Sequence, residues 1–108
     1  MRHLLACMFL LTTALPALAA APDGKTIAEQ GNGHGATACV ACHGQTFGGN
    51  PAIGAPALAG LPAATIEAKL VHYAGPAGHN PMMTPIATAL TPAERDAVAT
   101  YLASLPKA

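Results

Sequence analysis

The chain has 108 residues, which is enough for one small domain. Five Lys and Arg residues balance five Asp and Glu residues, and charged residues make up only 9% of the sequence. The absence of a basic cluster argues against a protein that binds nucleic acid, and no run of charges predicts a disordered tail.

The first segment, residues 1–19, has the pattern of a secretory signal peptide. A short cationic start is followed by the apolar run of residues 4–15 and a proline. Ala17 and Ala19 then fit the two positions that a signal peptidase reads. We therefore expect cleavage after Ala19, export to the periplasm, and a single mature domain of residues 20–108 with a net charge of about −1.

A retained membrane anchor is the alternative interpretation of this segment. Its strictly apolar centre is about a dozen residues long, whereas a helix that spans a bilayer needs about 20. Cys7 follows two leucines and an alanine, as in a lipoprotein signal, but it lies too near the start for a complete signal to precede it. We expect no transmembrane segment in the mature form.

The mature chain is poor in the large side chains that usually fill a core. Hydrophobic residues make up 52% of the sequence, but it has no Trp and only two Tyr and two Phe, and much of the apolar fraction is alanine. A domain of this size commonly needs a disulfide, a metal or a cofactor to be stable. The composition therefore predicts a large apolar group that is not part of the polypeptide.

The first half of the mature chain predicts two short helices and a long loop. A helix is expected at residues 23–30, with Asp23 as its N-cap, and it ends in the glycine-rich loop of residues 31–35. Residues 37–43 are compatible with one more helical turn. Residues 44–60 are rich in Gly and Pro and have no period, which is typical of an ordered loop that something holds in place.

A longer helix is predicted to follow this loop. It opens at Pro62 and ends before Gly75 and the proline after it. Ile66, Leu70 and Tyr73 recur at positions i, i+4 and i+7, so they share one face. We expect this face to pack against the rest of the domain.

The end of the chain predicts an irregular segment and a last helix. Residues 77–89 contain two prolines and are expected to be irregular. The last helix opens with the capping box Thr91-Pro92-Ala93-Glu94. Its apolar stripe consists of Val98, Tyr101, Leu102 and Leu105. The predicted fold is all-α, with three or four short helices wrapped around one central group.

The most specific motif of the sequence is Cys39-Val40-Ala41-Cys42-His43. Two thiols three residues apart on a helical turn can each add to one vinyl group of a haem, and the next residue brings an imidazole to the iron. A zinc site usually needs four ligands, a thioredoxin-like pair is expected beside a βαβ pattern, and a plain disulfide leaves the histidine without a role. We predict one haem c, bound covalently by Cys39 and Cys42, with His43 as the proximal iron ligand.

The distal iron ligand has to come from the opposite face of the ring and therefore from a distant segment. Met82 and Met83 lie about 40 residues downstream, where two flanking prolines disfavour helix, so we expect them on an extended stretch across the ring. Methionine also fills apolar space without binding metal. His72 and His79 are the alternatives and are expected to be solvated, and His34 in the glycine loop is expected to have no role.

Four segments of the mature chain together resemble the class I cytochromes c, in particular the small bacterial periplasmic cytochrome c553 and c4-type modules. These segments are Cys39–Gly44, Gly54–Gly60, Asn80–Ala87 and Leu90–Leu102. The first is highly specific for haem c, whereas the others specify this fold only in combination. The resemblance covers nearly all of the mature chain and implies the class I cytochrome c fold around one covalent haem.

The resemblance also implies roles for individual residues. The family's axial methionine lies two residues before a proline, which favours Met83 over Met82. In the family's Gly-x-Pro-x-Leu segment the proline carbonyl accepts a hydrogen bond from the proximal histidine, and the corresponding pair here is Pro56 and His43.

Three more residues are implied to contact the haem or to place the helices around it. Leu58 corresponds to the leucine that packs on the proximal haem face. Tyr101 and Leu102 correspond to residues that seat the last helix across the first, near Gly24 and Ala28.

With both axial positions filled, the iron has no open site, so the sequence predicts a periplasmic one-electron carrier and not an enzyme. The thioether ligand favours the reduced iron relative to bis-histidine ligation. Its partners would be redox proteins, an electron donor and an electron acceptor. One alternative is a haem subunit of a periplasmic dehydrogenase or oxidase complex, and another is a ligand-binding haem protein with a labile sixth position.

Overall fold

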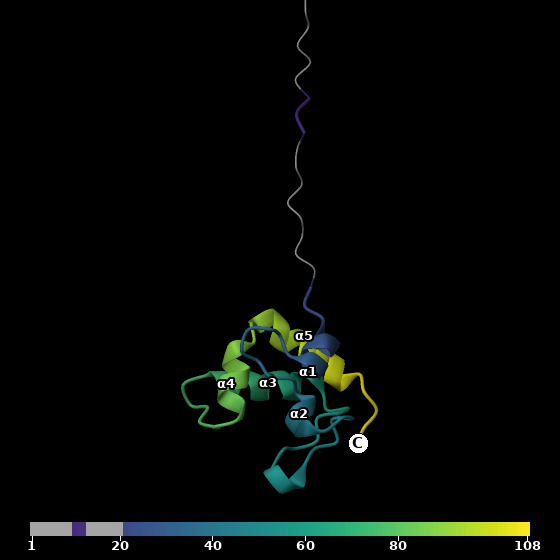
Figure 1. Ribbon diagram of the computed structural model, residues 1–108, viewed down its shortest axis with the longest axis vertical. Coiled ribbons are helices and arrows are strands. Elements are labelled where there is room, and N and C mark those ends of the chain that lie inside the picture. The colour runs from purple at the N-terminus through teal and green to yellow at the C-terminus, as the bar shows by residue number, and fades with distance from the viewer. Residues whose placement is uncertain (1–9, 13–20) are drawn as a thin grey trace, which may run out of the picture.

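The computed structural model describes residues 10–12 and 21–108 (Figure 1). The predicted signal peptide, residues 1–19, lies outside this part of the chain except for residues 10–12. The described residues form five α-helices and one 3-10 turn and contain no strand, which confirms the all-α prediction with one helix more than expected. The elements are α1 (Gly24–Gln30), α2 (Val40–His43), η1 (Pro51–Ile53), α3 (Ala63–Ala74), α4 (Met83–Ala89) and α5 (Pro92–Ala103).

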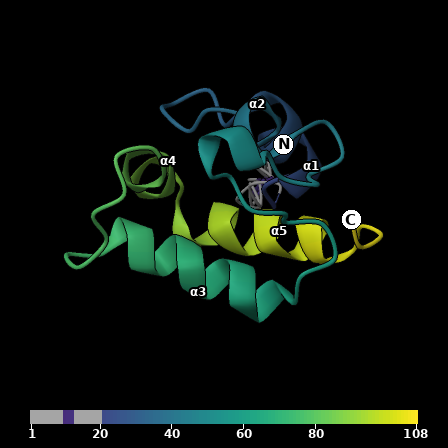
Figure 2. The same cartoon turned by 90° about the horizontal axis from the view of Figure 1, so that it is seen from below.

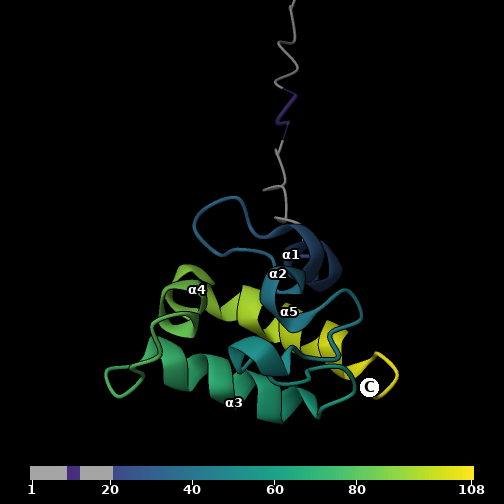
Figure 3. The same cartoon turned by 60° about the horizontal axis from the view of Figure 1, so that its bottom comes forward.

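Helix α5 lies at the centre of the fold. It packs against α1 on one side and against α3 on the other, as Figure 2 shows. The short α2 packs against α1, and α4 packs against α3 (Figures 2 and 3). Helices α2 and α4 therefore belong to different parts of the fold. None of the helices in the described ranges is long and apolar enough to cross a membrane.

Helices α1 and α5 cross closely because Gly24 has no side chain. A Cβ atom at this position would collide with the carbonyl oxygen of Ala97 and would lie 3.1 Å from Cβ of Tyr101. Near the same crossing, the Tyr101 hydroxyl donates a hydrogen bond to Oε1 of Glu29 at 3.2 Å. The predicted packing of the last helix across the first, near Gly24, is therefore present.

The predicted helix ends and helix faces agree with the structure at α1 and α3. Asp23 caps α1, and its side chain accepts hydrogen bonds from two backbone N–H groups of the first turn. Helix α3 starts directly after Pro62 and is capped by Gly75. Its Ile66 and Leu70 are buried toward α5, as the i, i+4 spacing predicts.

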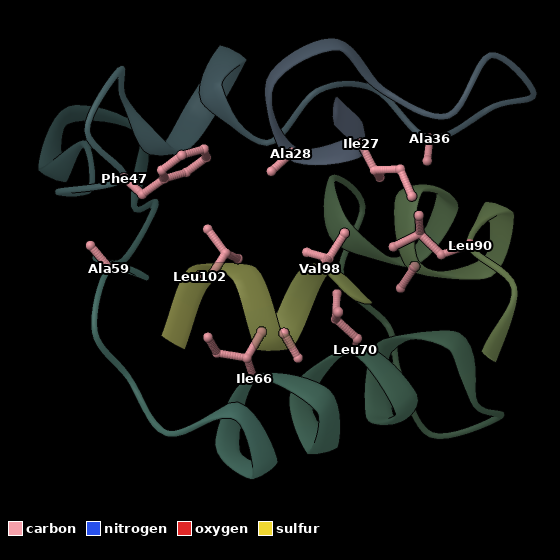
Figure 4. Packing of buried hydrophobic residues seen from close by; sticks show 12 residues of the cluster. Ile27, Ala28, Ala36, Phe47, Ala59, Ile66, Leu70, Leu90, Val98 and Leu102 are labelled. Carbon is pink, nitrogen blue, oxygen red and sulfur yellow. The ribbon is translucent and has the colours of Figure 1, made fainter. Parts of the chain in front are cut away.

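The hydrophobic core is built largely from small side chains (Figure 4). Five of the twelve buried hydrophobic residues of the described chain are alanine. The largest side chains that are fully buried are Phe47, Leu102 and Val98. The polypeptide alone therefore buries little apolar side chain for a domain of this length, in line with the composition.

Helix α4 corrects the prediction that residues 77–89 are irregular. The Oδ1 atom of Asn80 accepts hydrogen bonds from the backbone N–H groups of Met82 at 2.9 Å and Met83 at 2.8 Å, and α4 begins at Met83. Pro85 lies in the first turn, where a backbone N–H has no intrahelical partner to lose, so the helix tolerates it. The two methionines lie at the start of a helix and not on an extended stretch.

Helix α5 begins with the predicted capping box. The Thr91 hydroxyl accepts a hydrogen bond from the N–H of Glu94 at 3.1 Å, and Oε1 of Glu94 accepts one from the N–H of Thr91 at 2.9 Å. The backbone hydrogen bond from Thr91 is the main cause that holds the pKa of the buried Glu94 below its usual value. Side-chain hydrogen bonds from Thr91 and Asn32 act in the same direction.

We expect acid to destabilise the protein partly through Glu94. Its folded-state pKa is lowered, so its contribution to the free energy of unfolding is complete above the unfolded pKa, near 4.5, and is lost as pH falls through the folded pKa. Glu94→Gln should lower Tm at neutral pH and flatten the acid side of the plot of Tm against pH. Part of the slope should remain, because hydrogen bonds from Thr26 also lower the pKa of Asp23. An unchanged acid slope in the variant would contradict this role.

Candidate haem site

The attachment motif lies on one helical turn. Helix α2 ends at His43, and Cys39 precedes it with helical φ and ψ of −61° and −33°. The N–H of His43 donates to the carbonyl of Cys39 at 2.9 Å, which closes the turn. Cys39 and Cys42 are both free thiols and both half-buried. One turn therefore presents two thiols and an imidazole, the donor set that a covalent haem needs.

Two of the alternative interpretations of the cysteine pair fit this geometry poorly. Burial raises the pKa of the Cys39 thiol, whereas the attacking cysteine of a thioredoxin-like pair has a lowered pKa. Within residues 10–12 and 21–108, no three His, Cys, Asp or Glu side chains gather as they would around a zinc ion. The third, a plain disulfide, leaves the orientation of His43 unexplained.

The imidazole of His43 is held in one orientation by Pro56. Its Nδ1 lies 2.8 Å from the carbonyl oxygen of Pro56. Since a carbonyl only accepts, Nδ1 carries the proton, and Nε2 keeps the lone pair that binds a metal. His43 is only 6% exposed, yet no buried side-chain nitrogen or oxygen of the described residues lacks a partner, so Nε2 is not sealed inside the protein. These features fit a proximal haem ligand.

The loop that carries Pro56 is anchored on Phe47. The carbonyl of Phe47 accepts hydrogen bonds from the N–H groups of Leu58 at 2.9 Å and Ala59 at 3.1 Å. Phe47 is 2% exposed and has a positive φ of 57°, which is uncommon for a residue other than glycine. Phe47 was not among the residues predicted from the sequence. The sequence feature that could have pointed to Phe47 is that it is the only Phe of the predicted mature chain.

The two candidate distal methionines differ in burial. Met83 is half-buried and packs against the core, whereas Met82 is 63% exposed. Met83 begins α4, and His43 ends α2, so the two residues come from different parts of the fold, as ligands on opposite faces of a ring require. His72 and His79 are both exposed. The difference in burial favours Met83.

The other residues that the resemblance implies lie in the packing around the motif. Leu58 is half-buried against the core. Leu102 is fully buried, and its carbonyl accepts a hydrogen bond from Gly60 at 3.0 Å. The ring of Tyr101 meets Phe47 edge-on, with centroids 6.2 Å apart. Tyr101 also lines an open cavity of about 410 Å³ that none of the motif residues lines. Haem contact by these residues stays a prediction.

Comparison with known proteins gives the family. The family model described as cytochrome c matches residues 21–106, which is most of the chain. The chain belongs to the cytochrome c family. Haem c bound covalently through the cysteines of the attachment motif is the cofactor of this family, and the donor set on α2 fits it.

Relatives of this cytochrome c domain include electron-transfer proteins. Two are named thiosulfate dehydrogenase electron acceptor. The one from Stutzerimonas stutzeri (strain A1501) is 43% identical over 89 residues, which cover 82% of this chain and 41% of that protein. The one from Thiomonas intermedia (strain K12) is 43% identical over 70 residues, which cover 65% and 32%. The chain therefore spans less than half the length of these relatives.

Solved structures of the family have the same fold. A thiosulfate dehydrogenase from Marichromatium purpuratum aligns with a TM-score of 0.75 and 38% identity, over 79% of this chain and 18% of that chain. Cytochrome c4 of Acidithiobacillus ferrooxidans aligns with a TM-score of 0.71 and 35% identity, over 76% and 48%. The predicted class I cytochrome c fold is confirmed.

Proposed function

We propose that this cytochrome c domain carries single electrons on one haem c, bound by Cys39 and Cys42 and ligated by His43 and Met83. The observation that carries the proposal is the single turn with two thiols and an imidazole whose Nδ1 lies 2.8 Å from the Pro56 carbonyl. When bound, the haem supplies a one-electron iron couple that thioether ligation shifts toward the reduced form.

The residues of the chain hold the two axial ligands in place. Pro56 fixes the tautomer and ring orientation of His43, and Asn80 fixes the backbone of Met83 at the start of α4. Ligands that stay in place in both oxidation states keep the reorganisation on electron transfer small. With His43 and Met83 both bound to the haem iron, no site would be left there for a substrate.

We also propose that the mature protein works in the periplasm, after cleavage of the signal peptide at residues 1–19. The sequence supports this location, because a cationic start, an apolar run and small residues before the cleavage site follow one another as in a signal peptide.

A thiosulfate dehydrogenase is our candidate electron donor. Two relatives that are 43% identical to this chain are named as electron acceptors of such an enzyme. The aligned thiosulfate dehydrogenase of Marichromatium purpuratum contains a stretch that matches this chain over 18% of its length. That alignment also favours a second candidate function, a haem-carrying subunit or domain of a dehydrogenase complex.

Reduction by the donor is expected to depend only weakly on ionic strength, because the predicted mature domain has a net charge of about −1 and no charged cluster. Stopped-flow mixing with a purified thiosulfate dehydrogenase and thiosulfate would follow the rise of the reduced α-band. Between about 0.01 and 0.15 M salt, which shortens the Debye length from ~30 to ~8 Å, the rate should change less than about threefold.

Three other outcomes have distinct meanings. A fall in rate of tenfold or more over the same range would contradict a docking surface with little charge. If a chemical reductant reduces the protein and the dehydrogenase does not, the proposed electron donor is wrong, but the proposed electron-carrier function stands. Co-purification with a larger enzyme would favour the subunit function.

A further inference from the structure

Asn32 in the glycine-rich loop, residues 31–35, uses both ends of its side chain. Its Oδ1 accepts hydrogen bonds from the N–H groups of His34 and Ala36, both at 3.0 Å, and so folds the loop. Its Nδ2 donates to the carbonyl of Ala89 at 2.9 Å, 57 residues further along the chain, and lies 3.4 Å from Oε1 of Glu94. The loop is therefore tied to the junction of α4 and α5.

The carbonyl of Ala89 is one of the last in α4. Carbonyl groups in the last turn of a helix have no intrahelical partner, so the amide of Asn32 satisfies a group that the helix itself leaves free. Helix α4 has only seven residues and is too short to be stable without such contacts. Its first residue is Met83, which Asn80 fixes from the other end. Two asparagine side chains thus hold the two ends of this helix.

The loop lies tightly against this junction. In Figure 3 it arches from α1 toward α4 before the chain returns to α2. Gly35 has a φ of +118°, and a Cβ atom there would lie 3.1 Å from the Cβ of Ala89. Ala36 is buried and belongs to the same hydrophobic core as Leu90. The contact of Asn32 with α4 is therefore part of a packed surface.

We propose that Asn32 is a positioning residue for the distal iron ligand. It joins the segment that leads into Cys39 to the helix that begins at Met83, so it sets the two sides of the haem site relative to each other. The inference rests on the proposed His43–Met83 ligation. Loss of the amide donor should loosen the end of α4 and increase the population in which the methionine has left the iron.

Asn32→Asp in the haem-loaded protein is the most direct test. It keeps the Oδ1 acceptor for His34 and Ala36 and removes the Nδ2 donor, which bonds the carbonyl of Ala89 and also lies 3.4 Å from Oε1 of Glu94 and 3.3 Å from Nδ1 of His34. The fraction of ligated methionine is measured from the sulfur-to-iron charge-transfer band of the oxidised protein. The equilibrium constant for displacement should rise about tenfold, or 1.4 kcal/mol. Carbon monoxide should bind the reduced variant correspondingly more readily.

Two further variants serve as controls. Asn50→Asp makes the same chemical change at the cap of η1, where Oδ1 accepts from Ala52 at 3.2 Å, and it should leave the band unchanged. Asn32→Gln keeps an amide without a charge but moves it by one methylene. It should raise displacement by a smaller factor, which separates loss of the hydrogen bond from repulsion by Glu94. It also replaces Asn32→Asp if that variant does not accumulate with haem.

The comparison of two melting curves decides the outcome. In Asn32→Asp the charge-transfer band should disappear at a lower temperature than the helical circular dichroism, whereas wild type and Asn50→Asp should lose both together. Equal displacement constants in Asn32→Asp and Asn50→Asp, or loss of the band only with global unfolding, would overturn the inference. A wild-type protein without the band would instead remove the His–Met ligation on which it rests.

Discussion

Replacing both Cys39 and Cys42 with alanine is expected to give a largely unfolded protein without covalent haem. The reason is the core. Five of its twelve buried hydrophobic residues are alanine, and of the seven larger ones only Phe47, Leu102 and Val98 are no more than 2% exposed. A domain of this length with so little buried apolar side chain has a free energy of unfolding near zero without an added group.

The measurement is far-UV circular dichroism during urea titration, with mass spectrometry to determine haem content. The double variant should show little helix and no cooperative transition, whereas the wild type should unfold cooperatively. Cys42→Ala alone, which keeps one thiol and His43, should retain part of the haem and an intermediate stability. A double variant that melts cooperatively with native helix content would show that the polypeptide core is sufficient.

Met83→Ala is expected to leave the sixth coordination position of the haem iron without a protein ligand. Met82→Ala is expected to leave the ligation of the iron unchanged. Met83 packs against the core at the start of α4, and the neighbouring Met82 is 63% exposed, so the two variants form a matched pair. Loss of the thioether should abolish the sulfur-to-iron band and let carbon monoxide bind. It should also lower the potential by on the order of 0.1 V, within the ~0.8 V range that axial ligands set.

Absorption spectra and a redox titration of both variants would test this assignment. If Met82→Ala loses the band and Met83→Ala keeps it, the ligand is Met82. If neither variant changes the band, the sixth ligand lies elsewhere, and substitution of His72 and His79 would be the next step.

The start of α4 shows where sequence reasoning fell short. Thr91-Pro92 and Asn80-Pro81 are both a polar residue followed by proline. The first pair was used to predict α5, which begins at Pro92, whereas α4 begins two residues after the proline of the second pair, at Met83. At the second, Pro81 and Pro85 were both taken as reasons against helix, although Pro81 precedes α4 and Pro85, in its first turn, costs no hydrogen bond. The local signal for α4 was therefore present in the sequence and was given too little weight.

Local sequence patterns could not predict the contacts between residues far apart in the chain. The hydrogen bond from Asn32 to Ala89 joins residues 57 apart, and no periodicity or propensity links them. The contact between His43 and Pro56 came from resemblance to a family and not from spacing. The attachment motif and the helix caps of α1, α3 and α5 were predictable because each depends on residues within one or two turns.

The central claim is a covalent haem with His43 and Met83 as its two axial ligands. The most direct test is the absorption spectrum of the purified exported protein in oxidised form, in reduced form, and in reduced form under carbon monoxide. We predict a sharp reduced α-band, an oxidised sulfur-to-iron band, and no response to carbon monoxide. Covalent haem without the sulfur band, or with carbon monoxide binding, would contradict Met83 as a ligand, and absence of haem would contradict the whole assignment.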